Sequence, residues 1–260
     1  MAKVASGETM RSAARLLQVL KCFGAGSAGL SIAEISRALD LAPSTVRRLL
    51  MTLEAEGFVR QDAESGHYRL HYELIRLAAA ALSGSSLVKA AGPILDGLCA
   101  QLDEAVHLAV RDGADVILVD KRQSLHLVKT FHSIGHRYAG YRGSAAGKAL
   151  LAWLPDDALR GLLPTSGRWS APTDRAPRDR AGLRAALAKT RERGYALNDE
   201  ETEAGVWAVA VPVRDHHGAV VAALTVPCPT SRLSEDRRAL IIAAALEAAA
   251  TLSDAVPFAA

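Results

Sequence analysis

The sequence predicts an α+β protein in which a small helical unit with a β-hairpin precedes a larger unit that has an antiparallel sheet covered by helices. Three observations support this prediction. Two short amphipathic helices and a hairpin fit residues 31–70, a strongly helix-forming segment follows at 71–82, and helical and strand patterns alternate from residue 87 onward. With 260 residues, 50% of them hydrophobic, the chain can bury two separate cores.

Composition argues against several classes of protein. The net charge of +3 is too small to indicate nucleic-acid binding by itself, so any affinity for DNA must come from locally placed charge. Three widely spaced cysteines without a CxxC pair argue against a disulfide framework or a thiolate metal site. No apolar run approaches the roughly 20 residues of a membrane span, and the first ten residues lack the apolar block of a secretion signal. We therefore expect a cytoplasmic protein with no membrane contact.

The first helices are expected within residues 10–53. One begins at Met10 and ends before the segment 24–29. The next begins at Ser31, because Ser31 and Glu34 have the spacing of a capping box, in which each residue satisfies a free amide at the helix start. A break at residues 40–42 ends it, and Pro43 suits the first turn of a third helix.

The third predicted helix has a distinctive outer face. Its apolar residues repeat at i, i+3, i+4 and i+7 from Val46 to Leu53 and must face a core. The side chains left outside carry hydroxyl and guanidinium groups: Ser44, Thr45, Arg47, Arg48 and Thr52. Hydroxyl groups at a helix start can hold phosphates, and arginine can bind guanine O6 and N7, so this face suits the major groove of DNA. The alternative is an ordinary helical hairpin with solvated arginines.

A β-hairpin is expected directly after this helix. Residues 58–61 and 67–70 are extended segments, joined by a turn in which Gly66 can adopt a positive φ. Arg60, His67 and Arg69 lie on this ribbon, where arginines can neutralise DNA phosphates. A helix-turn-helix followed by a wing therefore becomes the better interpretation of residues 31–70.

Residues 10–70 resemble the winged-helix domain of the IclR family of bacterial transcription regulators, through the run SIAEISRALDLAPSTVRRLLMTLEAEGFV and the preceding SAARLL helix. The resemblance extends through residues 86–254, where GSAAGKALLAWLP, GYALNDEETEAGVWAVAVPVRDHHGAVVAALTV and the final helix are similar to the effector-binding domain of that family, a relative of the GAF fold. It implies a winged helix-turn-helix DNA-binding domain at 10–70, a linker helix at 71–85 and a GAF-like effector-binding domain at 86–256. Ser31 is also expected to contact DNA.

The linker helix carries more apolar side chains than one narrow face needs. They are Leu74, Ile75, Leu77, Ala78 and Leu82. The resemblance favours contact with a partner subunit, as a homodimer or a dimer of dimers, over a plain spacer helix. A two-fold axis would let two recognition helices meet successive faces of the major groove.

The larger unit is expected to alternate helices and strands. A long helix fits residues 87–102, and strands fit 105–110, 114–120 and 126–133. A hairpin turns at residues 216–218, and a closing helix from Ser234 to about Asp254 would cover one face of the sheet.

Enzyme and metal chemistry are poorly supported in this unit. The segment 143–148 lacks two of the residues that a phosphate-binding P-loop requires. His132 and His136 are expected on a strand and a turn, not on one helix face, which disfavours a metal site. The adjacent acids at 199–201 lack an accompanying nucleophile and are expected to be solvated. We therefore expect no catalytic residue, no cofactor and no metal.

A binding pocket is better supported. The helix expected from Ser144 starts with small residues, which leave open amides at its positive end for a carboxylate. The resemblance implies an effector between this helix start and the sheet, surrounded by Val128, Phe131, Ala139, Tyr141, Ser144, Ala145, Ala146, Asn198, Val206, Ala208, Thr225 and Pro227. Family members that bind small oxo-acids have polar or thiol groups where this chain has Ala208 and Pro227. We therefore expect an organic acid with an apolar body, aromatic bodies included. Trp207 is also expected nearby, with core packing as its alternative.

Together these features predict a regulator that binds double-stranded operator DNA and senses a small organic acid. The main alternative is an enzyme that acts on a small metabolite and carries an accessory winged-helix domain. A protein whose second domain only mediates assembly is a third possibility.

Overall fold

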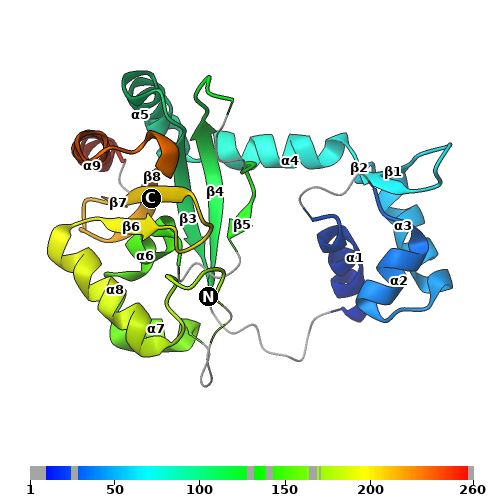
Figure 1. Ribbon diagram of the computed structural model, residues 1–260. Coiled ribbons are helices and arrows are strands. Elements are labelled where there is room, and N and C mark those ends of the chain that lie inside the picture. Colours follow the sequence, from blue (N-terminus) through cyan, green and yellow to red (C-terminus); the bar gives the residue numbers. More distant parts are fainter. Residues whose placement is uncertain are drawn as a thin grey trace. The chain divides into compact units, whose positions relative to one another are not determined.

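Figure 1 shows a computed structural model of the chain, which describes residues 10–24, 29–127, 132–138, 143–163, 169 and 171–256. The chain divides into two compact units, residues 1–84 and 85–260. The protein has the α+β fold expected from the sequence, a helix-turn-helix domain followed by a domain with an antiparallel sheet and helices.

The N-terminal unit is a winged helix. Its elements are α1 (Arg11–Cys22), α2 (Ile32–Leu39), α3 (Pro43–Ala55), β1 (Val59–Gln61), β2 (Tyr68–Leu70) and α4 (Tyr72–Ser83). Strands β1 and β2 pair antiparallel with Arg60 opposite Arg69, which confirms the predicted hairpin. Apolar side chains from all three leading helices and the wing form one core, which includes Val19, Ile35, Leu50 and Val59.

The turn between α2 and α3 follows the local sequence signals. The Ser31 hydroxyl accepts a hydrogen bond from the Glu34 amide at 3.2 Å, and the Glu34 carboxylate accepts one from the Ser31 amide at 2.8 Å. The predicted capping box is therefore confirmed. Asp40 ends α2 in the left-handed region with φ of 52°, and Pro43 occupies the first turn of α3. These two signals fix where α3 begins.

Helix α4 buries none of its residues within this chain. Tyr72 is 73% exposed, Ile75 64% and Leu77 42%. No single helix among the described residues is long and apolar enough to cross a membrane. Helix α4 passes such a test only together with the next helix, across a bend and on length and composition alone.

The C-terminal unit is built on a six-stranded antiparallel sheet with the order β5-β4-β3-β8-β7-β6. Its strands are β3 (Val106–Asp112), β4 (Asp115–Arg122), β5 (Arg137–Tyr138), β6 (Ala196–Asp199), β7 (Val206–Arg214) and β8 (Val220–Pro229). Its helices are α5 (Ser86–Leu102), α6 (Ala145–Leu151), α7 (Asp156–Leu162), α8 (Arg180–Arg193) and α9 (Glu235–Ala255), with a 3₁₀ turn η1 (Thr230–Arg232). Helices α5 and α9 cover one face of the sheet, and α6, α7 and α8 cover the other (Figure 1).

Successive side chains of β7 point alternately into two cores, one on each face of the sheet. Trp207, Val209 and Val211 face α5 and α9, whereas Ala208 and Ala210 face α6. Small side chains on the second face let α6 approach the sheet closely. The expectation that Trp207 lies by the pocket is wrong, because successive residues of a strand point to opposite faces; Trp207 is fully buried in the other core, under the Arg238 guanidinium.

Some elements differ from the sequence prediction. Residues 128–131 of the expected strand at 126–133 lie outside the described part of the chain. The described residues of that segment belong to no strand, and one edge strand of the sheet is β5.

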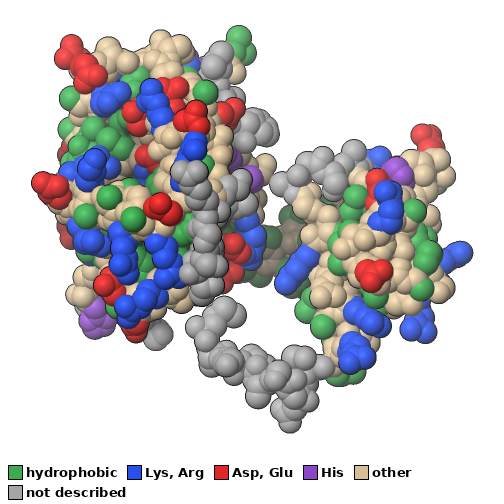
Figure 2. Space-filling view, turned by 60° about the horizontal axis from the view of Figure 1, so that its bottom comes forward, with side chains coloured by type: hydrophobic (Ala, Val, Ile, Leu, Met, Phe, Trp, Pro, Cys, Tyr) green, Lys and Arg blue, Asp and Glu red, His purple; other side chains and the backbone are tan. Residues whose placement is uncertain are grey.

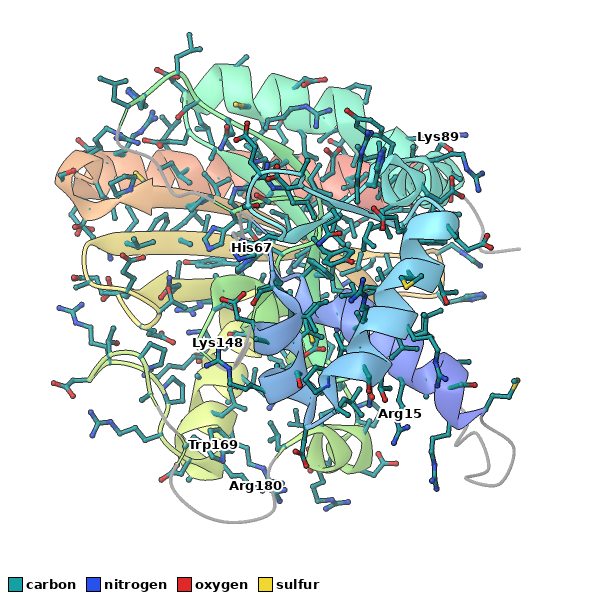
Figure 3. All side chains as sticks on the ribbon, turned by 90° about the vertical axis from the view of Figure 1, so that its right-hand side faces the viewer. Arg15, His67, Lys89, Lys148, Trp169 and Arg180 are labelled. Carbon is teal, nitrogen blue, oxygen red and sulfur yellow. The ribbon has the colours of Figure 1, made fainter. Side chains whose placement is uncertain are left out.

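Two hydrogen bonds hold the segment before α8. The Trp169 amide donates to the Arg178 carbonyl, and the Arg180 guanidinium donates to the Leu163 carbonyl (Figure 3 labels Trp169 and Arg180).

Candidate DNA-binding surface and ligand pocket

The outer face of α3 carries most of the side chains expected to contact DNA. Ser44, Arg47, Arg48 and Thr52 are exposed and Thr45 is half-buried, while Val46, Leu50 and Leu53 face the core. Within the described residues, neither Arg47 nor Arg48 forms an ion pair. Both guanidinium groups are therefore available for a partner, whereas the Thr52 hydroxyl already donates to the Arg48 carbonyl at 3.1 Å.

The wing adds further basic groups next to an acid. Arg60 and Arg69 are exposed and directly opposite each other, and His67 is half-buried (Figure 3). Arg69 lies 3.6 Å from Asp62. Hydrogen bonds from Ser65 hold the pKa of Asp62 below its usual value, so this carboxylate is charged and opposes an approaching phosphate. The two wing arginines are thus not equivalent.

Ser31 has a structural role on the same unit. Its hydroxyl also donates to the Glu34 carboxylate at 2.7 Å, so the hydroxyl is engaged on both sides by the capping box. Figure 2 shows that Lys and Arg side chains outnumber acidic ones on the visible face of the N-terminal unit. Basic side chains are thus exposed on this unit, although the net charge of the chain is only +3.

A cavity of about 190 Å³ lies between the start of α6 and the sheet. It is lined by His107, His132, Ser144, Ala145, Ala146, Asn198, Thr202, Glu203, Val206, Ala208, Thr225 and Pro227. The lining brings together eight of the residues expected around an effector: Ser144, Ala145, Ala146, Asn198, Val206, Ala208, Thr225 and Pro227. The other four, Val128, Phe131, Ala139 and Tyr141, lie outside the described residues.

Four lining residues were missed by the sequence reasoning. They are His107, His132, Thr202 and Glu203. His107 offered a signal, because it is the one polar side chain in the otherwise apolar strand segment AVHLAV. Thr202 and Glu203 follow β6 in a turn whose course is set by side-chain hydrogen bonds, which periodicity does not reveal.

The start of α6 is less open than expected. The Ser144 hydroxyl accepts a hydrogen bond from the Gly147 amide at 3.0 Å, so it caps the helix. The amides of Ala145 and Ala146 belong to the same first turn, where a helix leaves N–H groups without intrahelical partners. Helix α6 has only 7 residues, so its dipole is small and contact with its amides counts for more than its overall field.

A buried ion pair anchors the turn after β6 to α6. Lys148 on α6 is 2% exposed, and its ammonium group lies 2.5 Å from the Glu201 carboxylate (Figure 3 labels Lys148). Desolvation lowers the pKa of Lys148 and raises that of Glu201, and their mutual attraction opposes both shifts. The expectation that Glu201 is a solvated loop acid is therefore wrong. Asp199 and Glu200 instead lie within 3.0 and 3.3 Å of exposed Arg175.

Asn198 organises the same turn. Its carbonyl oxygen accepts hydrogen bonds from the amides of Glu201 and Thr202, at 2.8 and 3.2 Å. Its amide group donates to the Thr202 hydroxyl at 2.7 Å. The Asn198 side chain thus uses both its oxygen and its nitrogen in hydrogen bonds within the turn. Its main role is to hold the pocket wall in place and not to bind a ligand.

Histidines line the floor and one side of the cavity. Burial lowers the pKa of His107 to about 3, with smaller effects of the nearby His132 and Lys121, so His107 is neutral at pH 7. The rings of His107 and His132 are 6.0 Å apart, and those of His132 and His136 are 4.8 Å apart. Among the described residues, no group of three or more His, Cys, Asp or Glu side chains could hold a metal ion.

Comparison with known proteins agrees with this architecture. Residues 12–63 match the IclR helix-turn-helix domain, and residues 79–254 match the C-terminal domain of the bacterial transcriptional regulator IclR. The chain is 34% identical over 226 residues to the HTH-type transcriptional regulator XynR of Escherichia coli, which covers 87% of this chain and 89% of XynR.

Solved structures give the same result. The structure of an IclR transcriptional regulator from Alicyclobacillus acidocaldarius superposes with a TM-score of 0.85 at 28% identity, over 96% of this chain and 100% of that one. An IclR homolog from Microbacterium hydrocarbonoxydans, complexed with 4-hydroxybenzoate, gives a TM-score of 0.80 at 24% identity over 94% and 98% of the two chains. The second likeness concerns the fold alone.

Proposed function

Because this chain belongs to the IclR family of DNA-binding bacterial transcriptional regulators, we propose that it binds its operator as a homodimer and that a small organic acid in the pocket changes operator affinity. In this proposal residues 10–70 bind DNA, 71–85 link the domains and 86–256 bind the effector. The observation that carries it is the separation of an exposed basic helix face and an enclosed pocket into two compact units of one chain.

The proposed DNA contacts follow from exposure and chemistry. Arg47 and Arg48 read base edges from α3, and Ser44 and Thr45 hold phosphates near its first turn. Arg60, Arg69 and His67 contact the backbone from the wing. Thr52 contacts DNA from the C-terminal half of α3. Ser31 contacts DNA from the start of α2, where its amide and hydroxyl are already hydrogen-bonded to Glu34, so its contribution is smaller than that of the arginines.

The proposed dimer rests on the apolar side chains of α4. Tyr72, Ile75 and Leu77 are exposed in the single chain, where contact with water is unfavourable. A second copy of α4 is the occupant we propose, because two-fold symmetry pairs identical surfaces and places two recognition helices on one DNA site. Two such dimers can further associate into a dimer of dimers.

The proposed effector is a small organic acid with an apolar body. Val206, Ala208 and Pro227 form an apolar wall, and the amides of Ala145 and Ala146 can donate to a carboxylate without any arginine. The four expected residues outside the described part, among them Phe131 and Tyr141, stay in the proposal as effector contacts. The volume of about 190 Å³ is below the roughly 300 Å³ at which drug-sized sites begin, which favours a small metabolite.

We propose sensing and not catalysis for this pocket. Ser144 caps α6, Asn198 and Thr202 hold each other, and Glu201 pairs with Lys148, so these groups already have structural tasks. An enzyme needs a nucleophile or a base in hydrogen-bond reach of a reacting atom. The alternative of an enzyme with an accessory winged helix predicts chemical turnover of a bound acid.

The test begins with operator fragments selected from a library of random duplex DNA by the purified full chain. Operator affinity is then measured with and without each member of a panel of small carboxylic acids, and each acid is followed by mass spectrometry for conversion. We expect at least one acid to change operator affinity and to be recovered unchanged. Conversion of an acid would favour the enzyme, and no selected DNA fragment would contradict the operator-binding proposal.

A further inference from the structure

Two polar side chains lie at the floor of the cavity, on adjacent strands. His107 on β3 and Thr225 on β8 are directly opposite each other in the antiparallel pair. They are 3% and 7% exposed, and both line the cavity. Within the described residues, neither His107 Nε2 nor the Thr225 hydroxyl has a hydrogen-bond partner.

In this respect His107 and Thr225 differ from three other polar residues around the cavity. Ser144, Asn198 and Thr202 each make hydrogen bonds within the protein. A buried polar atom without a partner loses its bonds to water and destabilises the fold, so native proteins keep few of them. Two on adjacent strands, at the floor of one cavity, indicate a partner that the described part of the chain does not supply.

The charges of the residues around the floor of the cavity determine which ligand groups can bind there. His107 is neutral at pH 7 because it is buried, so it provides no positive charge to an anion. Glu203 also lines the cavity, and the Lys148 ammonium is held by Glu201. The Lys121 ammonium lies nearby, but it donates to the His132 carbonyl and does not line the cavity. Among the described residues no cation lines the cavity, so a carboxylate on this floor would leave water without a cation in contact, which is unfavourable.

A hydroxyl group fits the floor better. It donates one hydrogen bond and accepts others, and the Thr225 hydroxyl does the same. The neutral imidazole presents either an N–H or a lone pair at Nε2, and a hydroxyl can satisfy either tautomer. One ligand hydroxyl placed between the two side chains can therefore hydrogen-bond to both His107 Nε2 and the Thr225 hydroxyl.

We propose that His107 and Thr225 bind a hydroxyl group of the effector, so that the effector class is hydroxylated organic acids. This inference rests on the proposed sensing function and adds to it the group that determines ligand choice. The apolar wall then accommodates the carbon skeleton, and the carboxylate lies away from the floor.

The experiment uses pairs of acids that differ by one hydroxyl group: benzoate and 4-hydroxybenzoate, butyrate and 4-hydroxybutyrate, propionate and lactate. Dissociation constants are measured by calorimetry on the full chain. In at least one pair we expect the hydroxylated acid to bind about tenfold or more tightly than its partner, because only it satisfies the buried groups. That ratio should fall to near one in Thr225→Val and His107→Phe, and persist in Thr225→Ser.

Thr251→Val is the matched control, because Thr251 is an exposed threonine on α9 and should leave the ratio unchanged. Acids that bind and alter operator affinity without any preference for the hydroxyl would overturn this inference and leave the sensing function standing. A preference that survives both floor variants would also overturn it, because the hydroxyl would then bind elsewhere. If no acid binds at all, the inference and the proposed sensor fail together.

Discussion

At the scale of single residues, Arg47 and Arg48 give the sharpest test of the DNA-binding face. Both are exposed on α3 and neither forms an ion pair within the described residues, so replacement by alanine breaks no ion pair there. If either makes a bidentate base contact, Arg47→Ala or Arg48→Ala should weaken operator binding by about 1–3 kcal/mol. Fluorescence anisotropy with a selected operator measures the loss.

Arg15→Ala is the control for this prediction. Arg15 is an exposed arginine on α1, a different helix from the one that carries Arg47 and Arg48 (Figure 3 labels Arg15). It should retain operator affinity to within the few tenths of a kcal/mol typical of surface substitutions. Unchanged affinity in both α3 variants would mean that α3 does not read the bases.

His107 gives a second prediction at this scale. Its pKa is about 3 in the folded chain and 6.5 in the unfolded chain, so the unfolded chain takes up a proton first as pH falls. Stability from the neutral imidazole is therefore complete above pH 6.5 and is lost progressively below it. Between pH 7.5 and 5 the loss should be about 2 kcal/mol. His132, whose pKa is also lowered by burial, adds to the wild-type loss in the same direction.

Tryptophan fluorescence during urea unfolding measures this effect selectively. The 3 tryptophans, Trp153, Trp169 and Trp207, all lie in the C-terminal unit. His107→Gln should lose less stability than the wild type on acidification, by about 2 kcal/mol. An equal loss in the two proteins would show that His107 is not held neutral by the fold.

Residue-level prediction from sequence succeeded where the chemistry was local. The capping box needs only two residues three apart, and it is present. Eight expected pocket positions lie together around one cavity, but these positions came from family resemblance and not from periodicity. The Lys148–Glu201 pair joins residues 53 apart in the chain, and the His107–Thr225 pair depends on the order of strands in the sheet. No pattern within a short window contains that information.

At the scale of secondary-structure elements, strong periodicity was predictive and weak periodicity was not. The helix pair α2 and α3, the wing and the β7–β8 hairpin were all predicted, because each has a clear apolar pattern or a turn signal. Strand β5 has only two residues, too few to show alternation. Helix α8 carries many charges and only three buried residues, so its core face is narrow and its signal is weak.

The wing makes a prediction at this scale, because its two arginines differ in their surroundings. Arg60→Ala should weaken binding to all DNA sequences and reduce the slope of log affinity against log salt by about 0.9. Arg69→Ala should reduce the slope less, since Asp62 already neutralises part of its charge at 3.6 Å. Affinity for a random DNA duplex, measured at several salt concentrations between about 50 and 200 mM, gives both slopes.

Asp62→Asn is the matched variant for the wing. It removes the charge but keeps an oxygen that can accept the hydrogen bonds from the Ser65 amide and hydroxyl, at 2.9 and 2.8 Å. Binding to all sequences should become tighter, with a steeper salt dependence. Salt slopes that are the same in all three variants and the wild type would mean that the wing does not contact DNA.

At the scale of the whole molecule, the division into two units determines what a pocket substitution can do. Each unit has its own core, so filling the pocket need not disturb the winged helix. Ala208 lines the cavity and is 6% exposed, and Ala208→Phe would occupy space that the body of a ligand needs. Ala146→Asp would place a negative charge beside a bound carboxylate. Both should abolish the effect of the acid on operator affinity while ligand-free binding persists.

Ala219→Phe provides the matched control, because Ala219 is exposed at the tip of the β7–β8 hairpin. It should respond to the acid as the wild type does. A full response in both pocket variants would place the effector site elsewhere, and loss of ligand-free operator binding would mean that the pocket residues support the fold of the DNA-binding unit.

Linkage supplies a final, independent check of coupling between the two units. If an acid changes operator affinity by some factor, operator DNA must change the affinity for that acid by the same factor, whatever path connects the sites. Calorimetric titration of the acid into free protein and into the protein–operator complex should therefore give a ratio equal to the ratio of operator affinities with and without the acid. In Ala208→Phe the ratio of operator affinities should be one, and the acid should give no binding heat with either the free protein or the complex. An acid that alters operator binding without this reciprocity acts on the DNA or on protein assembly, and the pocket would then not be the sensor.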